Sequence, residues 1–338
     1  MNIHLIGQQD TKRYTYFLKA CKDMKAKLEF WDIHSNLAPF IKAYNFGDVI
    51  KIDPPHYKTS NVKELNSLVQ NYKNQLNLLA SIDNLKFLNT PQAIWNTLDK
   101  KICKEILEKE KIPTTPRLPK EFLSLEELKQ YMLNHRIYNV FIKPRFGSGA
   151  AGVMAYRIQP RVEAEILQTC LTKVEGNYTN TKRIQKFKDK MIIKELIDFI
   201  LSQDAIVERW IPKPKIGDIV YDLRAVYQFG KLDYLLARGA KEGAITNLHL
   251  NNHAVELKEL HLKDENLSDI EAICDNAISK IPGLNSVGID LILGIKNKKP
   301  MIIEMNGQGD LLYKDIYKDN IIYKNQVKYL QNILRNIL

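Results

Sequence analysis

Short apolar runs alternate with amphipathic stretches over residues 1–89. An apolar run of about five residues that stops at Gly or Pro predicts a buried strand, whereas apolar residues three and four apart predict a helix. The segment therefore predicts strands at residues 2–6 and 49–52 and helices at residues 11–27 and 61–80. This alternation is typical of a small open α/β unit. No Gly-x-Gly-x-x-Gly motif marks the unit as a dinucleotide site.

A second unit is predicted over residues 90–205. Thr90 and Pro91 form a helix-start signal, because threonine caps a helix and proline fits its first position. The apolar periodicity then continues to Leu107 and predicts a single helix. The remaining pattern of this unit predicts a helix at residues 124–134 and strands at residues 138–143 and 152–158.

Residues 206–338 are predicted to form a third unit. Two apolar stretches flank the turn Gly230-Lys231 and predict a hairpin. The predicted elements are strands at residues 205–211, 223–229, 231–238, 287–293 and 301–305, and helices at residues 265–281 and from Lys314 onward. Both the second and the third unit thus combine strands with helices.

Composition narrows the function classes without choosing one. The 338 residues are 45% hydrophobic and 26% charged, which is ordinary for a globular protein. No apolar run approaches the ~20 residues that span a bilayer, and the first residues lack the pattern of a secretory signal. The four cysteines form no Cys-x-x-Cys pair, in keeping with reduced, buried thiols. We therefore expect a cytoplasmic protein with no membrane partner.

Basic residues exceed acidic ones, with 50 Lys and Arg against 39 Asp and Glu and a net charge of +11. They are spread along the chain and do not form a basic run with interleaved aromatic residues. No nucleic-acid partner is therefore expected, although the basic balance is compatible with an acidic substrate.

Lys143 ends a predicted strand and precedes a loop of small residues that runs from Gly147 to Gly152. Backbone N–H groups of such a loop can wrap phosphate oxygens, and the lysine adds a positive charge. The loop is not a Walker A motif, because no Gly-Lys-Ser/Thr follows and the next residues form a predicted strand. The stretch predicts a phosphate grip between two strands, with a hairpin of no chemical role as the alternative.

Oxygen-bearing side chains stand on two neighbouring predicted strands. Asp290 lies on the first strand, and Glu304 and Asn306 lie two residues apart on the second, so these two side chains share a face. Hard divalent cations prefer carboxylate and amide oxygens. The flanking residues are apolar, and a buried carboxylate needs a partner. The pattern predicts a metal site rather than a solvated sheet edge.

Arg224 and Arg238 stand on the two strands of the predicted hairpin. Planar guanidinium groups suit the recognition of a phosphate or a carboxylate. The alternative is salt-bridging at the surface with Asp222 and Asp233. Asn247, which follows a glycine-containing loop, adds an amide group.

Eight motifs follow one another along the chain: Asp99-Lys100, Phe141-Ile142-Lys143-Pro144 with its small-residue loop, Val207-Glu208-Arg209-Trp210-Ile211, Asp222-Leu223-Arg224, Arg238, Thr246-Asn247-Leu248-His249, Gly288-Ile289-Asp290 and Ile303-Glu304-Met305-Asn306. In this order they resemble the ATP-grasp superfamily, and most closely its ribosomal-protein S6 glutamate ligase and glutathione synthetase-like branch. The resemblance covers residues 90–310. The implied fold class is α/β (α+β ATP-grasp), in which the N-terminal unit precedes two α+β subdomains that clasp ATP.

The resemblance also implies a role for each matching residue. ATP would be held by Lys100, Lys143, Gly147, Ser148, Gly149, Ala150, Gly152, Glu208, Arg209, Trp210 and Ile211, with Asp218 as the candidate for the ribose. Magnesium, as one or two ions that manganese can replace, would be held by Asp290, Glu304 and Asn306. The positions that face the transferred phosphoryl group, the metal or the acceptor would be Arg224, Arg238 and Asn247.

The implied reaction joins a carboxylate to an amine through an acyl-phosphate, with ADP and phosphate as the other products. Phosphoryl transfer needs positioning and charge neutralisation more than covalent chemistry, and the lysines, arginines and metal ligands supply both. The substrate would be an amino acid, a peptide or a protein tail, and a homodimer is in keeping with the resembled branch.

Two other functions stay open on the sequence: an ATP-grasp kinase of a small hydroxyl compound, and a non-catalytic nucleotide- or peptide-binding module. The metal ligands argue against the second. The chain departs from the family pattern at Asn251-Asn252, where two glycines are common, and at Ala150-Ala151 in the lid, where a further glycine is common. Both departures concern the acceptor more than ATP.

Overall fold

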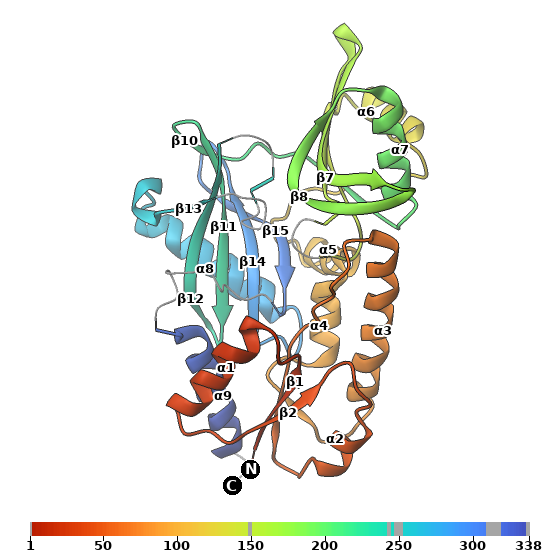
Figure 1. The fold of residues 1–338 in the computed structure, drawn as a ribbon. Helices are drawn as coiled ribbons and strands as arrows, with labels where there is room; N and C mark the ends of the chain where they lie inside the picture. Colours follow the sequence, from red (N-terminus) through yellow and green to blue (C-terminus); the bar gives the residue numbers. More distant parts are fainter. Residues whose placement is uncertain (1, 148–150, 242–244, 247–252, 309–318, 336–338) are drawn as a thin grey trace.

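The computed structural model describes residues 2–147, 151–241, 245–246, 253–308 and 319–335, which form three sheets and their covering helices (Figure 1). The first sheet is parallel, in the order β2-β1-β3-β4. Its elements are β1 (Ile3–Gly7), α1 (Lys12–Asp23), β2 (Leu28–Asp32), α2 (Ala38–Ala43), β3 (Val49–Ile52), α3 (Val62–Ala80) and β4 (Lys86–Phe87). β1 and β3 are buried along their whole length, as expected of parallel strands with helices on both faces. The predicted open α/β unit is confirmed.

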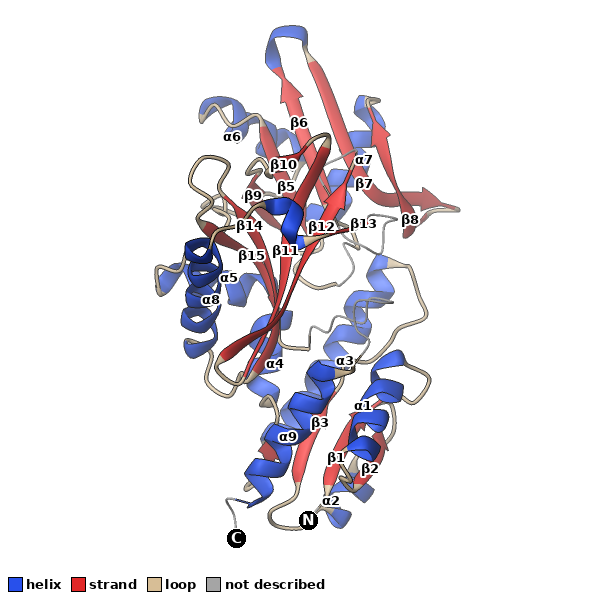
Figure 2. Cartoon of the chain, turned by 90° about the vertical axis from the view of Figure 1, so that its left-hand side faces the viewer, coloured by secondary structure: helices blue, strands red, loops and turns tan. Residues whose placement is uncertain are grey.

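Helix α9 (Ile321–Arg335) packs against this first sheet, although it is distant in sequence. It lies against α1 and β3 (Figure 1 and Figure 2). Tyr323, Val327 and Leu330 are buried there in one cluster with side chains of α1, β1 and β3. Helices α2 and α3 contribute to the cluster on the other face of the sheet. The predicted C-terminal amphipathic helix is present from Ile321, and residues 314–318 lie outside the described residues.

The second sheet is antiparallel, in the order β8-β7-β6-β5-β9. Its elements are α6 (Leu125–Asn134), β5 (Asn139–Lys143), β6 (Met154–Gln159), a short 3-10 turn (Pro160–Val162), β7 (Ala164–Val174), β8 (Asn177–Phe187), α7 (Lys190–Leu201) and β9 (Ile206–Arg209). The apolar side chains of α6 and α7 bury one face of the sheet. The sequence pattern had predicted neither the β7–β8 hairpin nor α7.

The third sheet is also antiparallel, in the order β13-β12-β11-β14-β15, with β10 paired to β11. Its elements are β10 (Lys215–Ile216), β11 (Ile219–Gln228), β12 (Lys231–Ala240), β13 (His253–Val255), a 3-10 turn (Leu257–Leu260), α8 (Asp264–Ser279), β14 (Ser286–Leu293) and β15 (Pro300–Asn306). Alternate residues of β11, among them Leu223 and Ala225, pack into a core with α8. Period-two alternation therefore turns Asp222 and Arg224 to the opposite face.

One predicted helix is in fact two. The chain forms α4 (Pro91–Leu98) and α5 (Lys100–Lys109), which are separated at Asp99 by an extended backbone (φ −80°, ψ 100°). The Asp99 side chain caps α5 by accepting hydrogen bonds from the N–H groups of Lys101 and Ile102. The prediction of a continuous helix was wrong, because apolar periodicity continues across the break while an aspartate restarts the helix as its N-cap.

Among the helices that the structure describes, none combines the length and the apolar character needed to cross a bilayer.

Candidate active site

A cavity lies where α5, β5, β9 and β15 meet, between the second and the third sheet. Its charged lining consists of Lys100, Lys104, Lys143, Glu208 and Glu304. Four of these were predicted as site residues from the sequence, and they come from segments that are far apart along the chain. The fold thus brings the predicted lysines and carboxylates into one place.

Glu208 is the most enclosed charge of the cavity, with 1% of its surface exposed. Its Oε2 accepts hydrogen bonds from Lys143 Nζ at 2.7 Å and from Thr115 Oγ1 at 2.8 Å. Burial by itself would raise the pKa of Glu208, but the charges of Lys104 and Lys143 outweigh it and hold that pKa below its ordinary value. Oε1 accepts no hydrogen bond from the described residues, and Lys104 Nζ faces it at 3.2 Å. This oxygen is therefore enclosed and held in an ion pair with Lys104.

Lys104 is a site residue that the sequence reasoning missed. It lies on α5 one turn after Lys100, and its ammonium donates to Thr114 Oγ1, to Thr115 Oγ1 and to the Thr115 carbonyl. Burial lowers the pKa of Lys104, and Glu208 offsets only part of that effect. The available signal was its position: Lys100, Cys103, Lys104 and Leu107 are buried at spacings i, i+3, i+4 and i+7, which mark the inward face of a helix.

Replacing Lys104 by methionine is expected to lower the free energy of unfolding by about 3 kcal/mol, because Glu208 would lose one of two cations that compensate its buried charge. Urea denaturation at neutral pH measures the change. Lys109→Met, at an exposed position on the same helix, is the matched control and should change stability by less than ~0.5 kcal/mol. Equal stability of the two variants would contradict a structural role for the Lys104–Glu208 pair.

Lys100 connects the small-residue loop to β15. Its Nζ donates to the Gly147 carbonyl at 2.6 Å and lies 3.3 Å from Glu304 Oε1. Gly147 has a φ of +123°, which only glycine adopts without strain. Gly152 closes the described part of the loop at φ +68°, and a Cβ there would lie 2.6 Å from Pro144. Ser148, Gly149 and Ala150 lie outside the described residues.

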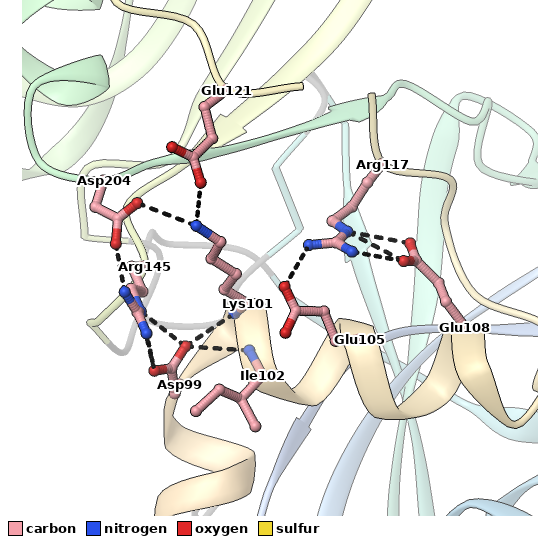
Figure 3. Close-up of polar contacts among 9 residues, drawn as sticks. All are labelled: Asp99, Lys101, Ile102, Glu105, Glu108, Arg117, Glu121, Arg145 and Asp204. Atoms are coloured by element: carbon pink, nitrogen blue, oxygen red, sulfur yellow. Dashed lines mark hydrogen bonds and ion pairs between the residues drawn. The ribbon is translucent and has the colours of Figure 1, made fainter. Parts of the chain in front are cut away.

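An ion-pair network anchors the start of this loop to α5 (Figure 3). The Arg145 guanidinium donates to both oxygens of Asp99, with Nε 2.9 Å from Oδ2, and also pairs with Asp204. Lys101 pairs with Asp204 and with Glu121. The Lys100 N–H donates to the Arg145 carbonyl at 3.2 Å. The residue that caps α5 thereby also fixes the backbone at the base of the loop.

A row of charged side chains crosses β12, β11, β14 and β15 beside the cavity. Arg224 pairs with Asp290 across the β11–β14 ladder, with Nη1 2.5 Å from Oδ1. Arg238 bridges Asp222 at 2.7 Å and Asp290 at 3.1 Å. Asp290 stands opposite Glu304 in the β14–β15 ladder. The sequence left open that these arginines pair with acids at the surface, and Arg238 does pair with Asp222, but both of these residues are buried. Arg224 and the predicted metal ligand Asp290 are partly buried.

The cations control the ionisation of this cluster. Burial by itself would raise the pKa of Asp290, and Arg224 and Arg238 more than reverse that effect. Burial acts on Asp222 in the same direction, but Arg238 and Lys213 hold the pKa of Asp222 below its ordinary value. Lys213 Nζ lies 2.9 Å from Asp222 Oδ2. Both aspartates are therefore ionised at neutral pH.

The folded state is expected to lose stability in acid through Asp222. Because its pKa is lower in the folded state than in the unfolded state, its contribution is complete above the ordinary aspartate pKa of about 4 and is lost as the pH falls below it. In Asp222→Asn, the unfolding free energy should therefore change less between pH 7 and pH 3 than it does in the wild type. Urea denaturation across this range measures it, with the exposed Asp83→Asn as control. If the unfolding free energy of Asp222→Asn depends on pH as it does in the wild type, the lowered pKa of Asp222 is contradicted.

The remaining predicted residues lie in different surroundings. Asn306 stands opposite Gly288 on β14, and its Oδ1 accepts from the Gln308 N–H. The N–H of Arg209 is bonded to the Pro116 carbonyl. Trp210 and Ile211 follow β9 and are partly buried. Asp218 is exposed in the β10–β11 turn and does not line the cavity, and Asn247 lies outside the described residues.

The predicted donor set for a cation consists of two carboxylates and one amide. Asp290, Glu304 and Asn306 lie on adjacent antiparallel strands and offer oxygen atoms, which Mg²⁺ prefers. The part of the chain that the structure describes contains no group of three or more His, Cys, Asp and Glu side chains placed to hold a metal. The chemistry of the predicted set fits a cation that also takes oxygens from a phosphate ligand, as Mg²⁺ does.

Solved structures identify the fold. No protein-family model matches the chain, and no curated protein matches its sequence. D-cycloserine synthetase DcsG is similar with a TM-score of 0.62 at 10% identity, over 98% of this chain and 100% of that one. D-alanine–D-alanine ligase from Bacillus anthracis is similar with a TM-score of 0.58 at 13% identity, over 100% of this chain and 98% of that one. The ATP-grasp ligase PsnB, complexed with minimal precursor, Mg and ADP, is similar with a TM-score of 0.59 at 11% identity, over 98% and 97%.

The chain has the fold of these structures over nearly its whole length, which confirms the fold class that the sequence implied, while membership in the superfamily stays a prediction. The three TM-scores are nearly equal although the proteins carry different names, so the fold does not select a branch. The assignment to the S6 glutamate ligase and glutathione synthetase-like branch stays a prediction.

Proposed function

We propose that this protein is an ATP-dependent ligase that joins a carboxylate to an amine. The observation that carries the proposal is the cavity in which Lys100, Lys104 and Lys143 surround Glu208 and Glu304, next to the cluster around Asp290. Clustered cations suit a triphosphate, and neighbouring carboxylates suit its metal ion. The names of the similar structures, a synthetase and two ligases, support the same class.

The nucleotide would bind between the second and the third sheet. Lys100 and Lys143 would contact its phosphates, covered by the loop that begins at Arg145 and includes Gly147 and Gly152. Glu208, which lines the cavity, would accept the amino N–H of adenine. Lys143 bonds Glu208 in this structure and would turn to the phosphates when ATP binds.

Asp290, Glu304 and Asn306 would hold Mg²⁺, whose charge would neutralise the triphosphate. The Mg and ADP named for the PsnB structure support this cofactor assignment. Arg224 and Arg238 keep Asp290 ionised and would face the phosphoryl group during transfer.

The reaction would proceed in two steps. A carboxylate oxygen of the substrate attacks the γ-phosphorus of ATP while the P–O bond to ADP breaks, which yields an acyl-phosphate. The amine then attacks the acyl carbon, the C–O bond to phosphate breaks, and the nitrogen loses a proton as the amide forms. Lys143, Arg224 and Arg238 would neutralise the phosphoryl oxygens in the first step, and the closed loop would exclude water from the acyl-phosphate.

Hydroxylamine trapping tests this proposal. The protein is incubated with ATP, Mg²⁺, hydroxylamine and a panel of amino acids and short peptides, while ADP and hydroxamate are measured. A ligase should release ADP and form a hydroxamate with its carboxylate substrate. ADP release with a phosphorylated hydroxyl product and no hydroxamate would indicate a kinase. No ADP release with any member of the panel would contradict the proposal.

A further inference from the structure

Lys104 is the one lysine of the cavity to which the proposed function gives no contact with the nucleotide. Its side chain is buried, and its ammonium group can donate three hydrogen bonds. All three have acceptors: Thr114 Oγ1 at 2.5 Å, Thr115 Oγ1 at 2.6 Å and the Thr115 carbonyl at 3.0 Å. Lys104 therefore lines the cavity but has no N–H left to donate to a ligand.

The two threonines hold Lys104 between the third sheet and Glu208. Thr114 Oγ1 and the N–H of Thr115 both donate to the Ile302 carbonyl of β15, at 2.8 Å and 3.1 Å. The Thr115 hydroxyl, which accepts from Lys104, donates in turn to Glu208 Oε2. Lys104 Nζ lies 3.2 Å from the other carboxylate oxygen, Oε1. The threonines thus fix the distance between this ammonium group and the carboxylate.

Lys143, the second cation beside Glu208, is held less firmly. Its Nζ donates to Glu208 Oε2 at 2.7 Å, and this oxygen is its one acceptor among the described residues. An ammonium group has three N–H donors, so two of them are not engaged by the part of the chain that the structure describes. Of the two lysines that compensate Glu208, one is therefore fixed and the other can change its partner.

The electrostatic balance at Glu208 is consistent with this difference. Burial acts to raise the pKa of Glu208, and the charge of Lys104 opposes that effect more strongly than the charge of Lys143 does. Lys104 is thus the larger of the two compensating charges. A carboxylate that keeps Lys104 keeps most of its stabilisation when Lys143 moves away.

We propose that Lys104 is a positioning residue that allows Lys143 to leave Glu208 when a nucleotide binds. This role rests on the proposed ATP site, in which Lys143 turns to the phosphates. Glu208 is 1% exposed, and a carboxylate so deeply buried is strongly destabilised when it loses its cations. With Lys104 in place, Glu208 retains an ion pair after Lys143 has moved. Without Lys104, the same movement would leave Glu208 uncompensated, so Lys143 would stay on the carboxylate.

Nucleotide binding to the whole protein tests this role. Calorimetric titration measures the affinities for a non-hydrolysable ATP analogue with Mg²⁺ and for adenosine, and the ratio of the two reports what the phosphates contribute. Lys104→Met should lower this ratio by ~10-fold, because a lysine that stays on Glu208 is lost to the phosphates. A purely structural role would weaken both ligands equally and leave the ratio unchanged. Lys109→Met, at an exposed position of α5, should change neither affinity.

Two double variants show whether Lys104 acts through Lys143. Lys143→Ala should lower the ratio by a similar factor, and Lys104→Met/Lys143→Ala should lower it no further. In Lys104→Met/Glu208→Gln, the neutral amide does not retain Lys143, so the ratio should return to within ~3-fold of the wild-type value. If Lys104→Met fails to fold, Lys104→Gln replaces it, since it keeps a donor for the Thr115 carbonyl. If adenosine binds too weakly to be titrated, the affinities of the same variants for the analogue decide.

The outcome for Lys104 is separate from the outcome for the reaction. Equal losses for the analogue and adenosine in Lys104→Met would overturn its role, and so would losses that multiply in Lys104→Met/Lys143→Ala, whether or not a hydroxamate forms. The expected binding pattern without hydroxamate formation would reject the ligase reaction and keep the role of Lys104. A wild type that binds the analogue no more tightly than adenosine would overturn both this role and the phosphate contact of Lys143.

Discussion

Replacing Glu304 by alanine is expected to reduce ATP turnover by at least ~100-fold, because the change removes a proposed metal ligand and the carboxylate that lies 3.3 Å from Lys100. ADP release should be slow in the variant, and adding Mg²⁺ should restore only a small part of the rate. The measurement is the rate of ADP formation over a titration of Mg²⁺ at saturating substrate. Protein stability should change little, since Glu304 is partly exposed.

The control for this variant is Glu259→Ala, which removes an exposed carboxylate in the 3-10 turn between β13 and α8. It should leave both the rate and its Mg²⁺ dependence unchanged. Wild-type turnover in Glu304→Ala would show that the metal assignment is wrong. Loss of turnover with an unaltered Mg²⁺ dependence would place Glu304 in the site but not at the metal.

Lys143→Ala is expected to weaken ATP binding by about 10- to 100-fold, the factor that corresponds to losing a charged hydrogen bond of roughly 1.5–3 kcal/mol. The side chain lies in the cavity and donates to Glu208 at 2.7 Å, its one acceptor among the described residues. Titration of a non-hydrolysable ATP analogue in the presence of Mg²⁺ measures the affinity.

Lys188→Ala, in the exposed turn between β8 and α7, provides the matched removal of a positive charge. It should bind the analogue with wild-type affinity. Equal affinities in wild type, Lys143→Ala and Lys188→Ala would contradict the phosphate-contact assignment. A loss of equal size in both variants would point to a general effect of net charge.

Strand patterning explains why much of the candidate site could be predicted. Asp290, Glu304 and the two arginines are charged residues inside apolar strands. Such side chains need partners of opposite charge, which favours a shared site. Lys104 was not predicted as a site residue, because a lysine on an amphipathic helix is normally assigned to the solvent face. Its role depends on Glu208, which meets it only in the folded chain.

The fold was likewise predicted where local periodicity is clear and was missed where an element depends on residues distant in sequence. Most elements of the first and third sheets were predicted, because their periods are clear. β8 contains only Tyr178, Ile184 and Phe187 as large apolar residues among eleven, so it shows no alternation that would predict a strand. The break at Asp99 was missed because periodicity reports which residues face inward and does not report where the helix axis changes direction. The hydrogen bonds of the Gln326 amide likewise join α9, β11 and β14, which meet only in the folded chain.

The docking of α9 on the first sheet has a consequence for synthesis. One face of β1 and β3 is covered by α1 and α9 together, so it stays only partly covered until residues 321–335 have left the ribosome. The unit that is made first therefore cannot complete its core until most of the chain has been translated. Nascent chains arrested before Ile321 should therefore expose Ile3, Phe17 and Val49 to chaperones and proteases, and release of the chain from the ribosome should restore protection.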